Sequence, residues 1–316
     1  MNKKEIVEYL KDDEKKEALF KKADRIREKY CGDKVLLRGI IEFSNHCVRN
    51  CFYCGLRRDN KKIMRYRMSE SLILDTVRKI YKAGIKTVIL QSGDDPGFRT
   101  DALCRLVKTI KARFPKMAIT LSVGERPLRD YKKFKDAGAD RYLLKHETAN
   151  KSLYAKLHPG QNLKQRIGIL KYLKKLGYDL GAGNIVGLPG QTEEDLAGDV
   201  LLMKKLKLDM AGIGPFIPQK DTPFGANFSG SADLTLKVLA LTRITLPKVN
   251  LPATTALATV DRHNGQLKAL NSGANVIMCN FTPQNFRKDY WIYDNKERAS
   301  LKKAIQTIKQ AKRKVF

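Results

Sequence analysis

The chain has 316 residues, of which 42% are hydrophobic, and this is enough to form one large core. No apolar stretch approaches the roughly 20 residues that cross a bilayer, which argues against a membrane protein. The formal net charge of +29 comes from lysines and arginines scattered along the chain, which favours a solvated basic surface. The N-terminal segment MNKKEIVEYLKDDEKKEALF is typical of a charged amphipathic helix and not of a signal peptide, so we expect a cytoplasmic protein.

Apolar, β-branched runs alternate with amphipathic segments along the chain. After two helices within residues 2–30, we expect strands near 36–44, 87–92, 118–123, 141–146, 180–186, 210–217, 250–256 and 275–281. Helices are expected between them, including 69–83, 101–114, 163–177, 192–207 and 232–245, and a basic helix near 297–314. This alternation predicts an α/β fold, a parallel (β/α)8 barrel of the TIM type. We expect an N-terminal helical extension (1–34), the barrel (35–295) and a C-terminal basic helix (296–316).

Several polar groups fall where the predicted strands end. A cysteine-containing loop follows the first strand, residues 92–94 follow the second, Glu147 follows the fourth, and Thr254 and Thr255 end the seventh. The active residues of such barrels lie at the C-terminal ends of the strands and in the loops after them. We therefore expect these groups to meet on one rim.

Three of the six cysteines form the motif Cys47-x-x-x-Cys51-x-x-Cys54. Thiolates at this spacing can ligate three irons of a cubane 4Fe-4S cluster and leave the fourth iron open. Zinc is the alternative, but structural zinc sites need four ligands and usually pair two C-x-x-C motifs, and the chain has no second pair. The spacing predicts one 4Fe-4S cluster. Cys31, Cys104 and Cys279 stand singly, and we expect them to be buried without a role.

The cysteine motif, with Tyr53 directly before Cys54, resembles the radical S-adenosylmethionine (SAM) superfamily. A more specific similarity, to the HydE-like branch, is carried by residues 41–47 (IEFSNHC), 54–60 (CGLRRDN), 66–68 (YRM), 90–96 (LQSGDDP), 141–150 (RYLLKHETAN), 186–192 (VGLPGQT), 212–218 (GIGPFIP), 252–256 (PATTA) and 273–278 (GANVIM). This branch contains the HydE maturase of FeFe-hydrogenase and relatives such as methylornithine synthase. The resemblance covers about residues 35–293. It implies an enzyme that reductively cleaves SAM at the cluster and releases a 5′-deoxyadenosyl radical.

The resemblance also implies which residues contact SAM. These cofactor-binding positions are Tyr53, Gln91, Ser92, Gly93, Asp94, Ser122, Glu147, Arg166 and Ile185. The turn at 92–94 matches the motif that holds the SAM amino group, and Arg166 can pair with the carboxylate through two parallel hydrogen bonds. The alternatives are a strand-end salt bridge for Glu147 and a solvated helix face for Arg166.

By the same resemblance, a substrate chamber lies inside the barrel. Its substrate-binding positions are Arg141, Lys145, Thr254, Thr255, Met278, Tyr290 and Tyr293. Two cations and two hydroxyls in a closed cavity predict a small anionic substrate, most simply a carboxylate. The chain departs from the HydE pattern twice. Lys145 stands where an arginine is usual, and no cysteine for an accessory cluster follows Cys279.

The leading hypothesis is therefore a radical SAM enzyme that acts on a small cysteine-derived substrate in assembly of the hydrogenase diiron centre. The implied partners are a reductant protein such as ferredoxin or flavodoxin, and sibling hydrogenase maturases. An alternative is a paralogue that acts on another amino acid or thiol; among the relatives, methylornithine synthase rearranges the carbon skeleton of lysine and biotin synthase inserts sulfur. A third is a nucleic-acid-binding iron–sulfur protein that uses the +29 charge, but no RNA-binding module accompanies it.

Overall fold

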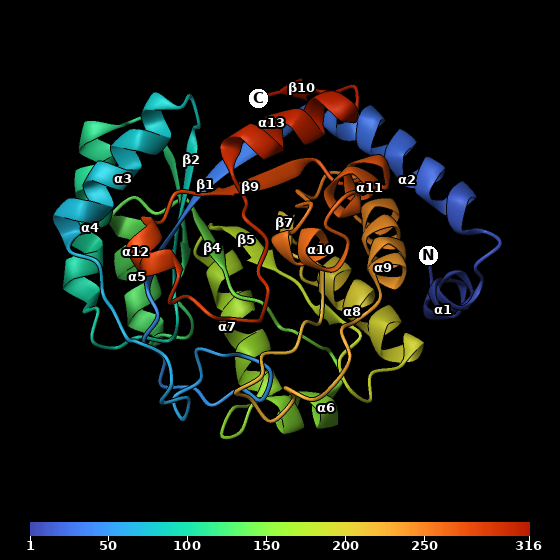
Figure 1. The fold of residues 1–316 in the computed structure, drawn as a ribbon, viewed down its shortest axis with the longest axis horizontal. Helices are drawn as coiled ribbons and strands as arrows, with labels where there is room; N and C mark the ends of the chain where they lie inside the picture. The colour runs from blue at the N-terminus through green and yellow to red at the C-terminus, as the bar shows by residue number, and fades with distance from the viewer.

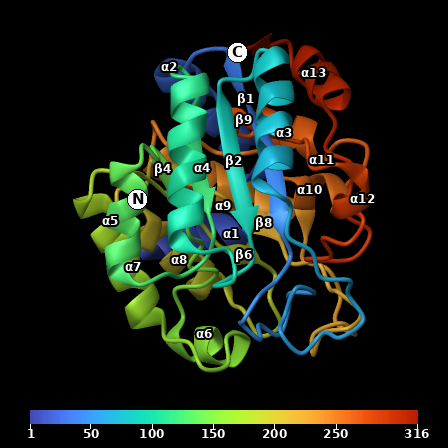
Figure 2. The ribbon, with the colours of Figure 1, turned by 90° about the vertical axis from the view of Figure 1, so that its left-hand side faces the viewer.

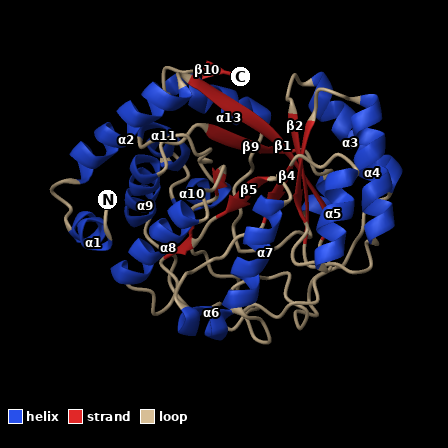
Figure 3. Ribbon diagram, turned by 180° about the vertical axis from the view of Figure 1, so that it is seen from behind, coloured by secondary structure: helices blue, strands red, loops and turns tan.

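The computed structural model describes residues 1–316, with a curved parallel sheet at the centre and helices around the outside (Figures 1 and 3). In spatial order the strands are β9 (Val276–Asn280), β1 (Lys34–Ser44), β2 (Thr87–Ser92), β3 (Ala118–Ser122), β4 (Arg141–Leu143), β5 (Asp179–Ala182) and β7 (Met210–Ala211). Parallel bridges from Asn250 to Met210 and from Pro252 to Val276 join the two ends of this row. The predicted parallel α/β barrel is confirmed.

Three predicted strands differ from those observed. The segment near 250–256 contributes only the two bridges, because Thr254 begins helix α10 (Thr255–Val260), where its hydroxyl accepts a hydrogen bond from the Leu257 amide. The segments near 180–186 and 210–217 each break into two short strands. Their second halves, β6 (Ile185–Val186) and β8 (Gly214–Pro215), pair with each other in a separate sheet. The first break lies at Gly183, whose φ of 145° favours glycine.

The helices cover the outer face of the barrel. They are α3 (Glu70–Lys82), α4 (Thr100–Arg113), α5 (Leu128–Asp136), α7 (Leu163–Lys175), α8 (Glu193–Lys205), α9 (Ala232–Thr245) and α11 (Gly265–Asn271), whereas the short helices α6 (Lys151–Leu157) and α12 (Gln284–Arg287) lie at the rim. Helix α3 shows why such segments form. Ser69 caps its first turn, and Ile73, Val77 and Ile80 recur at helical spacing and are fully buried. Ile80 packs so closely on β1 that a Cβ on Gly39 would lie 2.7 Å from its side chain.

Both ends of the chain pack against the barrel. Helices α1 (Lys3–Lys11) and α2 (Lys16–Cys31) lie against α8 and α9 (Figure 1). At the other end, α13 (Leu301–Gln310) begins later than the predicted 297 because Ser300 caps it, and β10 (Lys314–Val315) pairs in parallel with the start of β1. None of the helices has the length and apolar character needed to span a bilayer.

The loops at the C-terminal ends of the strands gather on one side of the molecule. Figure 2 shows the long loop 45–69, after β1, beside the loop 216–231, between β8 and α9. The two loops touch where the Phe224 amide donates to the Phe52 carbonyl at 3.1 Å and the two aromatic rings pack edge to face. This rim carries the site.

Candidate functional site

A cavity of about 860 Å³ opens at this rim. It is lined by the three motif cysteines and by every other predicted site residue except Arg141. The lining comes from the ends of β1, β2, β3, β4 and β9, from β6 and β8, and from the segment 284–299 that follows β9. Residues far apart in the sequence therefore meet in one space, as the barrel interpretation predicts.

Arg141 is the exception, and its predicted place in the chamber is wrong. It is the first residue of β4, so it lies at the opposite end of the strand from the rim. Its guanidinium pairs with Asp179 at 3.1 Å and donates to the Thr87 hydroxyl at 3.1 Å, and these residues begin β5 and β2. Of the two cations predicted to bind the substrate, only Lys145 lines the cavity.

The loop that carries the cysteines has little regular structure and is held by side chains that bind its backbone. Arg65 donates to the carbonyls of Asn45 and Leu56 at 2.6 and 2.9 Å, and to that of Arg57 at 2.7 Å. The buried Asn45 amide donates to Met64 O at 2.7 Å. The carbonyls of Asn45, Leu56 and Met64 accept no backbone hydrogen bond, so these side chains satisfy them.

The three thiols meet the requirements of a cluster that binds thiolates. Burial raises the pKa of Cys51 to about 12, with a further contribution from Cys47, and burial likewise raises the pKa of Cys54 and of Cys47. The three thiols do not surround a position for a single ion, either alone or with a carboxylate or imidazole. A cluster suits such a set because each thiolate binds its own iron, and the irons supply the positive charge that buried thiolates lack.

The turn after β2 approaches this loop closely. The Gly93 amide donates to Ser44 O at 3.3 Å, and a Cβ on Gly93 would lie 2.3 Å from His46 O and 2.7 Å from Cys47 Cβ. Val48 N donates to Asp94 O at 3.0 Å. Only glycine permits this contact between the cysteine loop and the turn.

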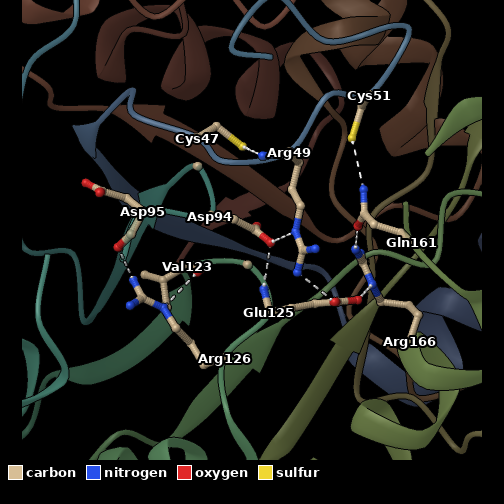
Figure 4. A network of polar contacts seen from close by, with 12 residues as sticks. Cys47, Arg49, Cys51, Asp94, Asp95, Val123, Glu125, Arg126, Gln161 and Arg166 are labelled. Atoms are coloured by element: carbon tan, nitrogen blue, oxygen red, sulfur yellow. Dashed lines mark hydrogen bonds and ion pairs between the residues drawn. The ribbon is translucent and has the colours of Figure 1, made fainter. Parts of the chain in front are cut away.

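Four charged groups form a chain beside the cysteines (Figure 4). Arg49 pairs with Asp94 at 2.6 Å and with Glu125 at 2.9 Å, and Glu125 also pairs with Arg166 at 2.6 Å. Arg49 and Glu125 are not among the predicted site residues, although Arg49 lies inside the cysteine motif. Glu125 follows β3 closely, and this position after a strand end was the one feature of the sequence that could have identified it as a site residue.

Arg166 is buried on the inner side of α7, which rules out a solvated helix face. Besides Glu125, its guanidinium donates to Lys145 O at 2.7 Å and to Gln161 Oε1 at 3.0 Å. Gln161, also absent from the prediction, donates in turn to Cys51 Sγ at 3.6 Å. The guanidinium is thus held on three sides before any ligand binds.

Glu147 occupies a strained position at the end of β4. Its φ is 63°, in the left-handed region that residues other than glycine seldom adopt. Its carboxylate lies 3.0 Å from Lys145 Nζ. This is the strand-end salt bridge that the sequence offered as the alternative to a contact with SAM. The pair lacks hydrogen-bond geometry, because Oε2 is buried without a donor. A ligand could therefore separate Lys145 from Glu147 at modest cost.

Tyr53 is fixed by a neutral histidine. His158 Nδ1 lies 3.0 Å from Tyr154 O, which can only accept, so Nδ1 carries the proton and Nε2 accepts from the Tyr53 hydroxyl at 3.0 Å. Burial, with the nearby Arg166, lowers the pKa of His158 to about 4 and keeps the ring neutral.

The cavity also contains an acid that was not predicted. Glu42, on β1, is 1% exposed, accepts from Asn280 Nδ2 at 2.8 Å and pairs with Lys296. The Lys296 ammonium lies 5.0 Å from the centre of the Tyr290 ring, and the Tyr290 hydroxyl meets Gln91 Nε2 at 3.1 Å. Lys296 thus ties the segment after β9 to the barrel interior.

Comparison with known proteins agrees with this geometry. The Radical SAM superfamily profile matches residues 41–203. The chain is 53% identical to the FeFe hydrogenase maturase subunit HydE of Thermotoga maritima over 280 residues, which cover 89% of this chain and 80% of that protein. It is 31% identical to 3-methylornithine synthase of Methanosarcina acetivorans over 271 residues, 85% of this chain and 75% of that one.

A solved structure of a related enzyme has the same fold. The crystal structure of methylornithine synthase (PylB) superposes with a TM-score of 0.89 at 27% identity and covers 100% of this chain and 94% of that chain. The resemblance inferred from the cysteine motif is confirmed. The chain belongs to the radical SAM superfamily, in its HydE-like branch, and is an enzyme that uses a 4Fe-4S cluster and SAM.

Proposed function

We propose that this enzyme is a HydE-type maturase that acts on a small carboxylate-bearing substrate in assembly of the FeFe-hydrogenase diiron centre. The observation that carries the proposal is one cavity lined both by the three cysteines and by Lys145, Thr254 and Thr255. The identity to HydE supports the reaction type. In the test, this chain replaces HydE in an anaerobic maturation mixture. The hydrogenase should become active, and an inactive product would contradict the proposal.

In this proposal each group at the rim has a stated task. Cys47, Cys51 and Cys54 would hold the cluster, which together with SAM supplies the electron and the 5′-deoxyadenosyl radical. The turn at 92–94 and Arg166 would orient the methionyl part of SAM. The remaining cofactor positions, Tyr53, Gln91, Ser122, Glu147 and Ile185, would enclose the nucleoside and exclude water.

The substrate side depends on Lys145 more than the sequence alone implied, because Arg141 lies elsewhere. Lys145 already pairs with Glu147, so a substrate carboxylate would compete with that acid for the ammonium. Thr254 and Thr255 offer hydroxyls to the cavity at the start of α10. Met278, Tyr290 and Tyr293 would form the surrounding wall.

The Lys145→Arg variant tests this reading of the substrate. We expect SAM cleavage without substrate to be nearly unchanged and substrate preference to shift, because arginine keeps the charge but adds a planar fork. The measurement is deoxyadenosine formation with cysteine derivatives, lysine and their decarboxylated analogues. A maturase should tolerate the change and respond to cysteine derivatives, whereas a paralogue should respond to another amino acid or thiol. Equal stimulation by acids and by their decarboxylated analogues would contradict a carboxylate site.

The Arg166→Ala variant tests SAM binding. Loss of a charged hydrogen-bond donor should weaken SAM affinity by about 1.5–3 kcal/mol while the cluster remains. The measurement is the SAM dissociation constant of the reconstituted protein, with iron content as a check. Arg129, exposed on α5, provides the matched control, and Arg129→Ala should leave affinity unchanged. An unaltered dissociation constant in Arg166→Ala would assign Arg166 to a structural role.

The expected partners and cellular compartment follow from the reductive cleavage of SAM. Reductive cleavage of SAM needs a one-electron donor, so we expect a ferredoxin or flavodoxin as partner, with sibling hydrogenase maturases as further partners. Free thiols and an oxygen-sensitive cluster need the reducing cytoplasm.

A further inference from the structure

We infer that Gln161 is a positioning residue that couples Arg166 to the cluster by fixing a hydrogen-bond donor on Cys51. Gln161 lies in the turn between α6 and α7 and lines the cavity. Its Oε1 accepts from Arg166 Nη2 at 3.0 Å, and its Nε2 lies 3.6 Å from Cys51 Sγ (Figure 4). The inference rests on the proposed roles of Cys51 and Arg166.

The orientation of the Gln161 amide is determined by its neighbours. A guanidinium can only donate, so the amide oxygen must face Arg166. The amide nitrogen must then face the sulfur, although oxygen and nitrogen are otherwise hard to distinguish. The turn itself is anchored, because Gln161 N donates to His158 O at 3.0 Å. The position of Arg166 therefore determines that Gln161 directs its N–H group at the Cys51 sulfur.

Arg166 is in turn held by Glu125 and Lys145 O, at 2.6 and 2.7 Å. A ligand carboxylate that pairs with Arg166 must compete with these groups, so the guanidinium and the Gln161 amide would shift together. Gln161 thus connects, through one hydrogen bond on each side, the group proposed to bind SAM and a cluster ligand.

The expected consequence concerns the reduction potential. Hydrogen bonds to the sulfurs of a cluster tune its potential, and a donor stabilises the reduced form because that form is more negative. Removing the Gln161 donor should therefore make the potential more negative. Because coupling is reciprocal, the change in potential on SAM binding and the ratio of SAM affinities for the reduced and oxidised enzyme must report the same coupling.

The test uses the reconstituted enzyme and the variants Gln161→Leu and Gln161→Glu. Leucine removes the donor, whereas glutamate keeps the shape and the acceptor for Arg166 but presents oxygen to the sulfur. Gln165→Leu, exposed on α7, is the matched control. The readouts are the midpoint potential from a redox titration followed by electron paramagnetic resonance, with and without SAM, the SAM dissociation constants and the iron content.

We expect both variants to keep the wild-type iron content, to have more negative potentials and to show a smaller change in potential when SAM binds. The control should behave as wild type. If leucine lowers the iron content, the glutamate variant decides the result, because it keeps the bond to Arg166. Wild-type potentials in a variant with full iron would overturn this inference alone. A wild-type chain that holds no cluster would instead overturn the proposed function as well.

Discussion

Replacing Cys51 with alanine is expected to abolish SAM cleavage and to lower the iron content well below the roughly four irons of one cluster. The cavity offers three thiols and no carboxylate or imidazole that completes a single-ion site with them, so a lost thiolate has no substitute nearby. The same result is expected for Cys47→Ala and Cys54→Ala. The measurements are iron and sulfide content after anaerobic reconstitution, and deoxyadenosine formation with dithionite.

The other cysteines supply the control. Cys104 lies on α4, on the outer layer of the barrel, and Cys279 lies on β9 within the core. Neither lines the cavity, so Cys104→Ala should retain the iron and the activity of the wild-type protein. Near-full iron and SAM cleavage in Cys51→Ala would contradict the assignment of the motif.

The residues of the rim could be predicted from the sequence because strands and helices alternate regularly along the chain. Strand–helix alternation fixes which residues end a strand, and parallel strands place all such ends on one side. Residues 92–94, Glu147 and the cysteine loop therefore meet as predicted. The order of strands and helices along the chain was sufficient to predict that these residues meet.

The prediction for Arg141 was wrong for a reason that strand ends do not explain. Arg141 and Lys145 were both placed in the chamber by the resemblance to the family. Lys145 is four positions further along the chain and lies beyond the end of β4, toward the rim. The resemblance did not show where along the strand Arg141 lies, and β4 begins at Arg141 itself, at the end opposite to the rim.

The prediction of a seventh strand at 250–256 was wrong for a different reason. The β-branched residues in 250–256 are typical of a strand, but Thr254 is equally suited to cap a helix. The observed chain uses it as a cap for α10, so both Thr254 and Thr255 still reach the cavity from a helix start. A pattern of residue types alone does not distinguish these two outcomes.

Apart from the position of Glu125 after β3 and of Arg49 inside the cysteine motif, nothing in the sequence distinguished Glu125, Arg49 and Gln161 from other polar loop residues. Each is a single polar residue in a loop, and its partners lie 5 to 110 positions away, as for the Gln161 bonds to Arg166 and Cys51. Their importance comes from burial and pairing, which depend on the assembled barrel. Charges on this rim are paired with one another, so the cavity is less cationic than the +29 of the chain implies.

The Glu125→Gln variant is expected to lose about 3 kcal/mol of unfolding free energy, the lower end of the range for breaking a buried ion pair. The Glu125 side chain is 6% exposed and joins Arg49 to Arg166, whose side chain is 9% exposed. Arg49 keeps Asp94, but Arg166 would be left as a buried cation without an acid. The loss should therefore come chiefly from Arg166.

The measurement is urea unfolding of the reconstituted protein under anaerobic conditions. Asp136→Asn is the control, because Asp136 pairs with Lys132 on an exposed helix face, where such pairs contribute about 0–1 kcal/mol. A second variant, Glu125→Gln with Arg166→Leu, should recover part of the lost stability, since it removes the unpaired cation as well. If Glu125→Gln unfolds at the wild-type urea concentration, the chain of charges contributes no stability. Its role would then be confined to orienting Arg49 and Arg166 for a ligand, and SAM affinity would fall without any change in unfolding.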